Sequence, residues 1–117
     1  MPRGKKRVHD NSAEHATFLN FKNNARRRGI RIEISKTEWK ELVIQECYYC
    51  GDPGSNLTQS CGHLFRHNGI DRLNKDLGYI EGNVVPCCKW CNTAKMSQNE
   101  QEFLDRILKI YHHRLSK

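Results

Sequence analysis

The stretch of sequence that decides the fold covers residues 68–95 and reads NGIDRLNKDLGYIEGNVVPCCKWCNTAK. We predict one strand over residues 64–71 and a second at Val84-Val85. The residues between them, 74–82, are rich in Asn, Asp and Gly, which favour turns. The sequence therefore predicts a β-hairpin, followed by a short helix after Cys91.

Two Cys-x-x-Cys pairs frame this hairpin, with 37 residues between them. Two cysteines at this spacing lie on a tight knuckle, and four thiolates at about 2.3 Å complete tetrahedral zinc without an open position. We therefore predict one structural zinc ion, bound by Cys47, Cys50, Cys88 and Cys91. Cys87 fits less well than Cys88, because three residues separate it from Cys91. Cys61 stands alone and is expected to be a small core residue.

The composition suits one small domain that needs such a staple. The chain has 117 residues, of which 37% are hydrophobic, so its core is thin. The basic N-terminus has no apolar stretch behind it, so we expect no secretion and a location in the cytoplasm. In that reducing compartment, six cysteines favour metal binding over disulfides. No apolar run is long enough to span a membrane.

Positive charge is concentrated ahead of the first cysteine. Residues 1–40 carry eleven Lys and Arg against four acidic residues, and the rest of the chain is neutral overall. This segment therefore carries the whole net charge of +7. A one-sided basic segment is typical of proteins that bind nucleic acid. A solvated, solubilising tail is the alternative interpretation.

The first 46 residues are predicted to hold two helices. Ser12 should cap the first helix and Gly29 should stop it, while Ser35-x-x-Glu38 is a capping box for the second. Between them, the alternating residues 30–34 predict a strand or an extended segment. The chain thus divides into a flexible basic N-terminus over 1–11, a basic helical and extended segment over 12–46, and a zinc-stapled core over 47–117.

The core part is predicted to end in a helix that reaches about residue 113. Ser97-x-x-Glu100 predicts its capping box. Apolar residues follow at helical spacing and are expected to face the core; they are Phe103, Leu104, Ile107, Leu108 and Tyr111. A loop is expected over residues 51–60, where Gly, Pro, Ser and Asn are frequent.

The pattern G-I-D-R, G-Y, N-V-V-P-C-C, C-N and K over residues 69–95 resembles the HNH endonucleases of the ββα-metal fold. It is most similar to a phage-type branch, with G-I-D-R in place of the usual D-H. The resemblance extends from Cys47 to the final helix. It implies an α+β fold, in which a ββα-metal core with the four-cysteine zinc site is flanked by N-terminal and C-terminal helices. It also implies a metal-dependent DNA endonuclease that nicks DNA or cuts both strands, leaving 5′-phosphate and 3′-hydroxyl ends.

The resemblance also implies roles for residues of the motif. Asp71 matches the first ligand of the catalytic ion and Asn92 matches the second; their oxygens suit Mg²⁺ or Mn²⁺. Two protein ligands would leave positions for water and phosphate. Asn83 matches the central Asn, which in the family braces the loop and the general base. The usual base is a His after the Asp, but Arg72 stands there; it has no acceptor and would instead stabilise the phosphate.

The general base must therefore be another group. His67 is the first candidate, because on a regular strand it would share a face with Asp71 and its pKa range suits the role. His63 is the second candidate and Tyr49 the third. Activation of water mainly by the metal is the remaining alternative.

DNA is the expected partner, bound by a monomer or a homodimer. Clustered charge carries little sequence information, so Arg26, Arg27 and Arg28 are expected to contact backbone phosphates. Lys95 would contact a phosphate or only solvent, and Tyr79 and Trp90 are expected in the core. A non-catalytic zinc-containing nucleic-acid-binding module is the alternative function, and a structural or protein-interaction zinc domain is a third.

Overall fold

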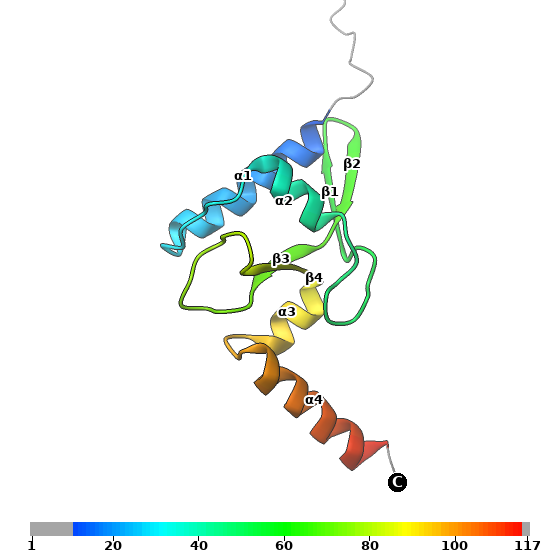
Figure 1. Ribbon diagram of the computed structural model, residues 1–117. Helices are drawn as coiled ribbons and strands as arrows, with labels where there is room; N and C mark the ends of the chain where they lie inside the picture. Colours follow the sequence, from blue (N-terminus) through cyan, green and yellow to red (C-terminus); the bar gives the residue numbers. More distant parts are fainter. Residues whose placement is uncertain (1–10, 116–117) are drawn as a thin grey trace, which may run out of the picture.

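Along the described residues, two helices come first, four strands follow, and two helices come last. The structure, a computed structural model, describes residues 11–115 (Figure 1). The elements are α1 (Ser12–Arg27), α2 (Lys36–Val43), β1 (Asn56–Ser60), β2 (His63–His67), β3 (Gly69–Arg72), β4 (Val84–Cys87), α3 (Lys89–Lys95) and α4 (Glu100–Arg114). The predicted mixed helix-and-strand fold is confirmed. The predicted flexible N-terminus over 1–11 lies outside the described residues except for its last position.

The strands form two antiparallel pairs, β1 with β2 and β3 with β4. The second pair is the hairpin predicted from the central stretch, and its register places Asp71 opposite Val85. The chain leaves β4 directly into α3, so hairpin and helix form one ββα unit. This unit carries Asp71 on a strand and two cysteines at the start of the helix that follows.

An aromatic cluster around Trp39 joins the N-terminal helices to the hairpins. Trp39 is 1% exposed, and its ring lies 5.1 Å from that of Phe18 and 6.1 Å from that of Phe65 between centroids. Phe21 makes an edge contact with Tyr79 at 4.8 Å. Each such pair adds about 0.5–1.5 kcal/mol beyond the area it buries. The predicted core position of Tyr79 is confirmed.

The predicted strand over 64–71 is wrong, because Asn68 breaks it into β2 and β3. The Asn68 side chain is fully buried; its amide donates to the carbonyl oxygens of Gln45 and Asp52, and its oxygen accepts the backbone N–H of Ser55. Its own N–H donates to the carbonyl oxygen of Val43. These bonds tie the chain to the end of α2 and redirect it into a second sheet.

Of two more predictions about extended structure, the loop is wrong, and the strand or extended segment is observed only as an extended segment. The expected loop over 51–60 contains β1, which pairs with β2. The alternating stretch 30–34 makes a single bridge, Ile32 with Tyr79, instead of a strand. A side chain at Gly78 would collide with the carbonyl of Arg31, so only glycine permits this close approach.

The helix caps are partly as predicted. The capping box of Ser35 and Glu38 is present, and Gly29 follows α1 with a φ of +72°. Ser12 does not cap α1; its hydroxyl donates to the carbonyl oxygen of Ser60 in the β1–β2 hairpin. The capping box of the last helix is formed by Asn99 and Glu102, two residues later than predicted.

The last helix, α4, does not pack as expected. Phe103 is buried and makes an edge contact with Tyr49 at 5.4 Å between ring centroids. The other residues predicted to face the core are 41–53% exposed. They are Leu104, Ile107, Leu108 and Tyr111. The helix extends away from the rest of the chain (Figure 1), so its apolar stripe has no partner among the described residues. None of the helices described is both long and apolar enough to cross a membrane.

Candidate nuclease site and zinc centre

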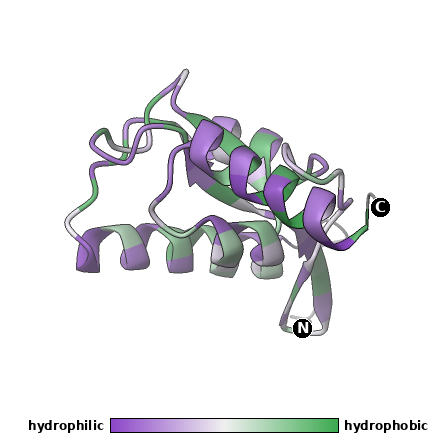
Figure 2. Cartoon of the chain, turned by 90° about the horizontal axis from the view of Figure 1, so that it is seen from below, coloured by the Kyte–Doolittle hydropathy of each residue, from purple (hydrophilic) through white to green (hydrophobic). Residues whose placement is uncertain are grey.

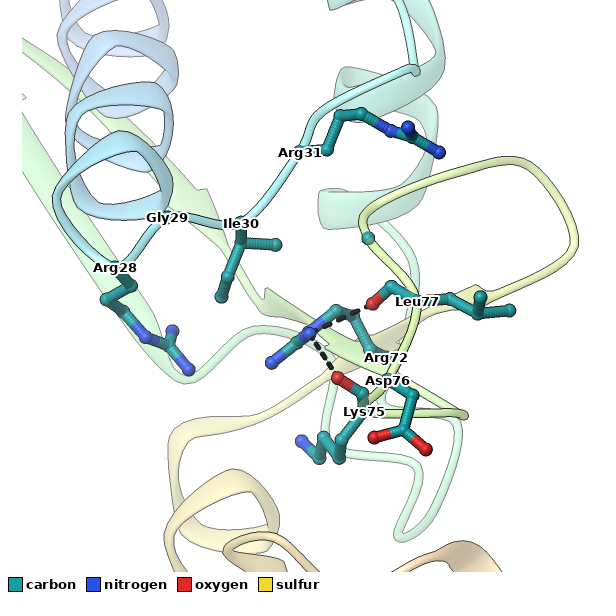
Figure 3. Close-up of a pocket in the computed structure, with 9 residues that line it drawn as sticks. Arg28, Gly29, Ile30, Arg31, Arg72, Lys75, Asp76 and Leu77 are labelled. Carbon is teal, nitrogen blue, oxygen red and sulfur yellow. Dashed lines mark hydrogen bonds between the residues drawn. The ribbon is translucent and has the colours of Figure 1, made fainter.

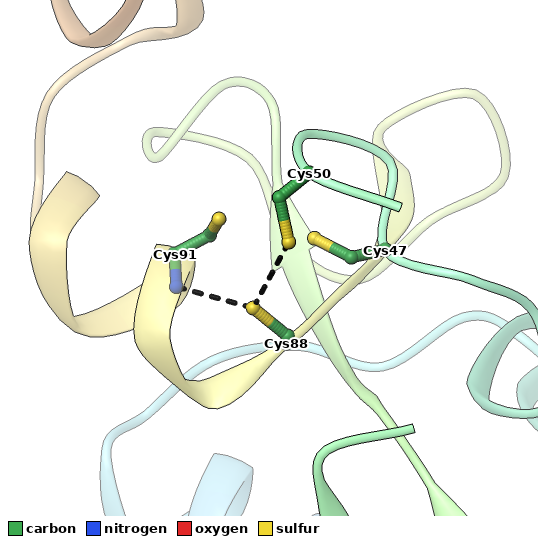
Figure 4. A group of neighbouring side chains, drawn as sticks. All are labelled: Cys47, Cys50, Cys88 and Cys91. Carbon is green, nitrogen blue, oxygen red and sulfur yellow. Dashed lines mark hydrogen bonds between the residues drawn. The ribbon is translucent and has the colours of Figure 1, made fainter. Parts of the chain in front are cut away.

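The four predicted zinc ligands converge. The sulfur atoms of the two pairs all lie within 4.8 Å of one another, and those of Cys50 and Cys88 are 3.6 Å apart (Figure 4). Tetrahedral zinc with bonds of about 2.3 Å needs sulfur separations of this size. Among residues 11–115, this is the one group of three or more Cys, His, Asp or Glu side chains placed to hold a metal. The donor set and the spacing both fit zinc.

Backbone geometry prepares this cluster. The first knuckle closes through a bond from the Gly51 N–H to the Cys47 carbonyl, and Gly51 has a φ of +81°. Cys88 is the N-cap residue of α3, and its sulfur accepts the N–H of Cys91 at 3.3 Å. Although burial raises the pKa of the Cys47 thiol, backbone hydrogen bonds outweigh it and lower the value to about 7. A thiolate is therefore accessible near neutral pH.

The two remaining cysteines stay outside the cluster. Cys87 is fully buried on β4, and its thiol donates to the carbonyl oxygen of Cys88 at 3.5 Å. Burial raises its pKa, so it remains a thiol. Cys61 is exposed in the β1–β2 turn with a φ of 51°, so its predicted core position is wrong.

Asp71, which is 1% exposed, is the centre of a buried network of charges. One carboxylate oxygen accepts the Lys75 ammonium at 2.8 Å, and the other meets the Tyr49 hydroxyl at 2.7 Å and the Lys95 ammonium at 3.0 Å. Burial raises the pKa of Asp71, but the hydrogen bonds from Lys75, Tyr49 and Lys95 lower it by more. The carboxylate is therefore ionised at neutral pH.

This network decides how well Asp71 suits a divalent ion. Carboxylate oxygens are good ligands for Mg²⁺ or Mn²⁺. Here, however, both oxygens are bound by cations or a hydroxyl donor, and the exposed Asn92 makes no hydrogen bond to Asp71. A second cation at this carboxylate would have to displace an ammonium group. In the described arrangement, Asp71 and Asn92 do not fit a catalytic ion, so we assign no chemical step to one.

Lys95 does not lie where the sequence suggested. Its side chain is 0% exposed, so it cannot contact DNA, and the prediction of a phosphate contact is wrong. Its ammonium has Asp71 as its ion partner and lies 5.9 Å from the centre of the Tyr49 ring. Lys95 lies on α3, three residues after Asn92. Its ion pair with Asp71 joins this helix to the hairpin.

Asn83 braces the loop that connects β3 to β4. Its side-chain oxygen accepts the Asn74 N–H at 2.8 Å, and its amide donates to the carbonyl oxygens of Asn74 and Gly78. Its own carbonyl accepts the N–H of Leu73. Asn83 is 5% exposed, and these bonds satisfy its polar atoms. Its side chain therefore braces the loop, and its hydrogen bonds go to loop backbone instead of to a candidate general base.

The two candidate histidines have neighbours other than Asp71. His67 faces Thr58: its Nε2 lies 3.0 Å from the threonine hydroxyl, and its Nδ1 lies 3.0 Å from the Asn68 carbonyl. His63 lies opposite Ser60 at the turn of the β1–β2 hairpin, at the end away from β3 (Figure 1). The broken strand removes the geometric reason for choosing His67.

Tyr49 touches Asp71 but in the wrong protonation state. Its hydroxyl donates to the carboxylate, as described above. Burial first, and then the hydrogen bond to Asp71 and the charge of that carboxylate, raise the pKa of Tyr49 far above its ordinary value. A phenol held protonated in this way cannot take a proton from water. The structure therefore makes Tyr49 a positioning residue for Asp71.

A basic cavity of about 550 Å³ lies beside this network (Figure 3). Its cationic side chains come from α1, the stretch after α1, β3 and the loop after β3; they are Arg28, Arg31, Arg72 and Lys75. One guanidinium nitrogen of Arg72 donates to the carbonyl oxygens of Lys75 and Leu77, which fixes the side chain at the cavity wall. Arg31 pairs with Glu33 at 2.6 Å and Lys75 pairs with Asp71. The lining nevertheless holds more cations than carboxylates, which suits an anionic ligand such as phosphate.

The other predicted DNA contacts are only partly gathered there. Of the three consecutive arginines at the end of α1, Arg28 lines the cavity, while Arg26 and Arg27 are exposed and bond to Asn23 and Asn24 one turn earlier. Trp90 is 71% exposed on α3, so its predicted core position is wrong.

Comparison with known proteins supports the fold. No family model matches the chain. A solved structure of the rare-cutting HNH restriction endonuclease PacI superposes with a TM-score of 0.61 at 22% identity, covering 97% of this chain and 95% of that one. The chain therefore shares its overall fold with an HNH endonuclease. The predicted relationship to this group is supported at the level of the fold, while the details of the ββα-metal core and the G-I-D-R branch stay predictions.

One curated protein is similar in sequence. An uncharacterized protein of Acanthamoeba polyphaga mimivirus is 31% identical over 100 residues, which is 86% of this chain. The chain spans 17% of the length of that protein. The similarity shows that a segment like this one also occurs within a much longer polypeptide.

Sequence reasoning misses two members of the site and assigns a third the wrong role. Tyr49, the third candidate base, holds Asp71 instead, while Lys75 and Arg31 are not singled out by the motif. Lys75 is four residues from Asp71 in a loop, so no strand or helix periodicity connects the two. Arg31 lies on a segment whose backbone is tied to Tyr79, since its carbonyl accepts the Tyr79 N–H at 2.8 Å.

Proposed function

We propose that the chain is an endonuclease that hydrolyses phosphodiester bonds of DNA in the basic cavity beside Asp71. The supporting observation is one arrangement: a buried, ionised carboxylate on the ββα hairpin, beside a cavity lined by four cationic side chains, in a chain that shares its overall fold with an HNH endonuclease. A pure structural zinc domain needs neither the buried carboxylate nor the cavity. The proposed products carry 5′-phosphate and 3′-hydroxyl ends.

In this proposal the basic cavity binds the DNA backbone. Arg72 contacts the scissile phosphate and stabilises the charge that develops on its oxygens in the transition state. Lys75 lines the same cavity and also binds Asp71, so it links phosphate binding to the carboxylate. Arg28 and Arg31 hold the flanking backbone. Neither a general base nor a Mg²⁺ or Mn²⁺ ion at Asp71 and Asn92 is assigned a step, because both Asp71 oxygens are already bound by protein groups.

Plasmid cleavage tests this proposal. Supercoiled plasmid is incubated with the zinc-loaded protein and with added Mg²⁺ or Mn²⁺, without added ion, and with a chelator, while protein-bound zinc is measured in parallel. We expect conversion to nicked or linear DNA. The dependence on added ion tests the predicted divalent cation. No conversion under any of these conditions, with zinc content intact, would contradict the proposal.

A zinc-containing nucleic-acid-binding module without catalysis is the second candidate. The closed state of Asp71 favours it, because both carboxylate oxygens are already bound by protein groups. The usual His is also replaced by Arg72. This candidate predicts salt-dependent DNA binding with no cleavage under the conditions above. A gel-shift titration on the same plasmid fragments separates the two candidates.

A further inference from the structure

The last helix presents an apolar stripe to solvent. Its members recur three or four residues apart and are between 41% and 72% exposed. They are Leu104, Ile107, Leu108, Tyr111 and Leu115. In Figure 2, green apolar stretches recur along this helix between purple polar ones. Of the residues of α4, only Phe103 is buried against the rest of the chain.

Such a stripe is unusual for a helix that stands alone. Isolated helices of about 12–15 residues are marginal in water, and tertiary packing of an apolar face normally supplies their stability. Helix α4 has 15 residues and a good capping box, but its stripe packs against none of the described residues. A partner that covers the stripe would supply the missing packing.

Charge along α4 identifies that partner. Acidic side chains outnumber basic ones in its first two turns, and the titratable side chains of the later turns that carry charge are basic. They are Glu100, Glu102 and Asp105 with one arginine, Arg106, against Lys109, His112, His113 and Arg114. Two such helices side by side in parallel would place like charges together. In antiparallel orientation, the acidic half of each helix lies against the basic half of the other.

We propose that α4 pairs with α4 of a second copy of this chain, antiparallel and about a twofold axis. Such an interface is isologous: the same patch serves on both copies, and its charges complement themselves. The twofold axis passes near Ile107 and Leu108, and Leu104 of one copy faces Tyr111 of the other. Apolar residues at three- and four-residue spacing pack into the grooves of the facing helix.

The size of the stripe predicts the strength of association. One helix per partner lies at the low end of specific interfaces, which bury about 800 Å² on each side at standard size. We therefore expect a dimer that dissociates in the micromolar range, where 1 μM corresponds to about 8 kcal/mol. The dimer should form in the zinc-loaded protein without DNA, so it stands apart from the proposed catalysis.

Sedimentation velocity over a range of concentrations tests the dimer. The wild type should shift from monomer to dimer as its concentration rises through micromolar values. Leu108→Glu should remain monomeric, while Leu64→Glu, a change at an equally exposed leucine on β2, should dimerise like the wild type. A wild type that stays monomeric at about 100 μM, well above the expected dissociation constant, would overturn the proposal, as would dimerisation of Leu108→Glu.

Charge variants test the antiparallel orientation. Converting Asp105 to Lys removes the acidic excess of the first half of the helix, and converting Lys109 and Arg114 to Glu makes the second half acidic; both variants keep the capping box of Asn99 and Glu102. Each variant alone should lose self-association by at least about tenfold, and an equimolar mixture should recover dimers. In a Cys61→Ser background, Leu104→Cys should cross-link to Tyr111→Cys but not to itself. Self-cross-linking of Leu104→Cys would show a parallel pair and overturn the antiparallel arrangement.

Discussion

Asp71 binds two ammonium groups and a hydroxyl while almost wholly excluded from water. Removing one partner of a buried ion pair leaves an uncompensated charge and costs about 3–5 kcal/mol. The Lys95 side chain is 0% exposed, so it has no access to water that could replace Asp71. The carboxylate therefore contributes to stability as well as to the proposed chemistry.

A double-mutant cycle measures that contribution. Asp71→Asn should lower the free energy of unfolding by about 3–5 kcal/mol, because it leaves the Lys95 ammonium buried and unpaired. Asp71→Asn combined with Lys95→Met should recover most of the loss, since both charges are then removed. Chemical denaturation of the zinc-loaded proteins gives the values. Equal stability of the single and double variants would show that the two side chains do not interact.

His67 should give the fold a measurable dependence on pH. Burial lowers the pKa of His67 below its ordinary value of 6.5, although the hydrogen bond to Asn68 partly opposes this. The unfolded chain therefore binds a proton more readily than the folded one. The contribution of neutral His67 to the free energy of unfolding is complete above about pH 6.5, and it is lost as the pH falls through the lower pKa of His67 in the folded chain.

Thermal unfolding at pH 7.5 and pH 5.5 tests this dependence. Between pH 7.5 and pH 5.5, the melting temperature of the wild type should fall further than that of His67→Gln. His112→Gln, a change on the exposed end of α4, should behave like the wild type. A direct NMR titration of the His67 ring should give a pKa below 6.5; a value above 6.5 would refute the assignment.

At the scale of elements, the zinc centre joins pieces that lack a large shared core. Cys47 and Cys50 lie after α2, whereas Cys88 and Cys91 belong to the first turn of α3. The same helix carries Lys95, which meets Asp71 on β3. A zinc ion bound by these four cysteines would fix the start of α3, and through α3 the position of Lys95 against the hairpin.

Loss of zinc should loosen the whole site. Cys91→Ser should reduce the bound zinc, measured by atomic absorption, from one ion per chain and should lower the melting temperature, because four-thiolate sites contribute to folding directly. Cys61→Ser is the matched control, since Cys61 is exposed and outside the cluster. It should keep both zinc and stability. Full zinc occupancy in Cys91→Ser would contradict the four-cysteine assignment.

The elements also show what the sequence could predict. The zinc ligands, the β3–β4 hairpin and the Ser35 capping box follow from short spacings, each a local property of the chain. The break at Asn68 depends on carbonyl groups at Gln45 and Asp52, which are distant in sequence. The network at Asp71 likewise depends on tertiary placement, so the motif identified the carboxylate but not its partners.

At the scale of the whole molecule, positive charge and the basic cavity lie together. The excess charge of residues 1–40 includes Arg28 and Arg31, which the fold brings beside Arg72 and Lys75 of the ββα unit. The predicted boundary between residues 46 and 47 stays a prediction, but the aromatic cluster of Trp39 and Phe65 crosses it. The basic segment and the zinc-stapled part therefore pack on one another.

The cavity should control the salt dependence of DNA binding. Arg28→Gln combined with Arg31→Gln should weaken binding and reduce the slope of log K against log salt by up to about 0.9 for each phosphate that the variant no longer neutralises. Lys40→Gln is the control, because Lys40 pairs with Glu14 outside the cavity. Fluorescence anisotropy with a short duplex at several salt concentrations gives the slopes. An unchanged slope in the double variant would show that the DNA binds outside this cavity.

The central claim is that DNA is cut in the basic cavity beside Asp71. The most direct measurement is single-turnover plasmid cleavage by three folded, zinc-loaded proteins: the wild type, Asp71→Asn with Lys95→Met, and Glu81→Gln. The paired variant removes the carboxylate without leaving Lys95 unpaired, and Glu81 is an exposed carboxylate of the same loop that does not line the cavity. We predict a loss of at least about 100-fold in rate for the paired variant, typical of removing a group that acts in the transition state, and little change for Glu81→Gln. Cleavage by the paired variant at the wild-type rate would contradict the account.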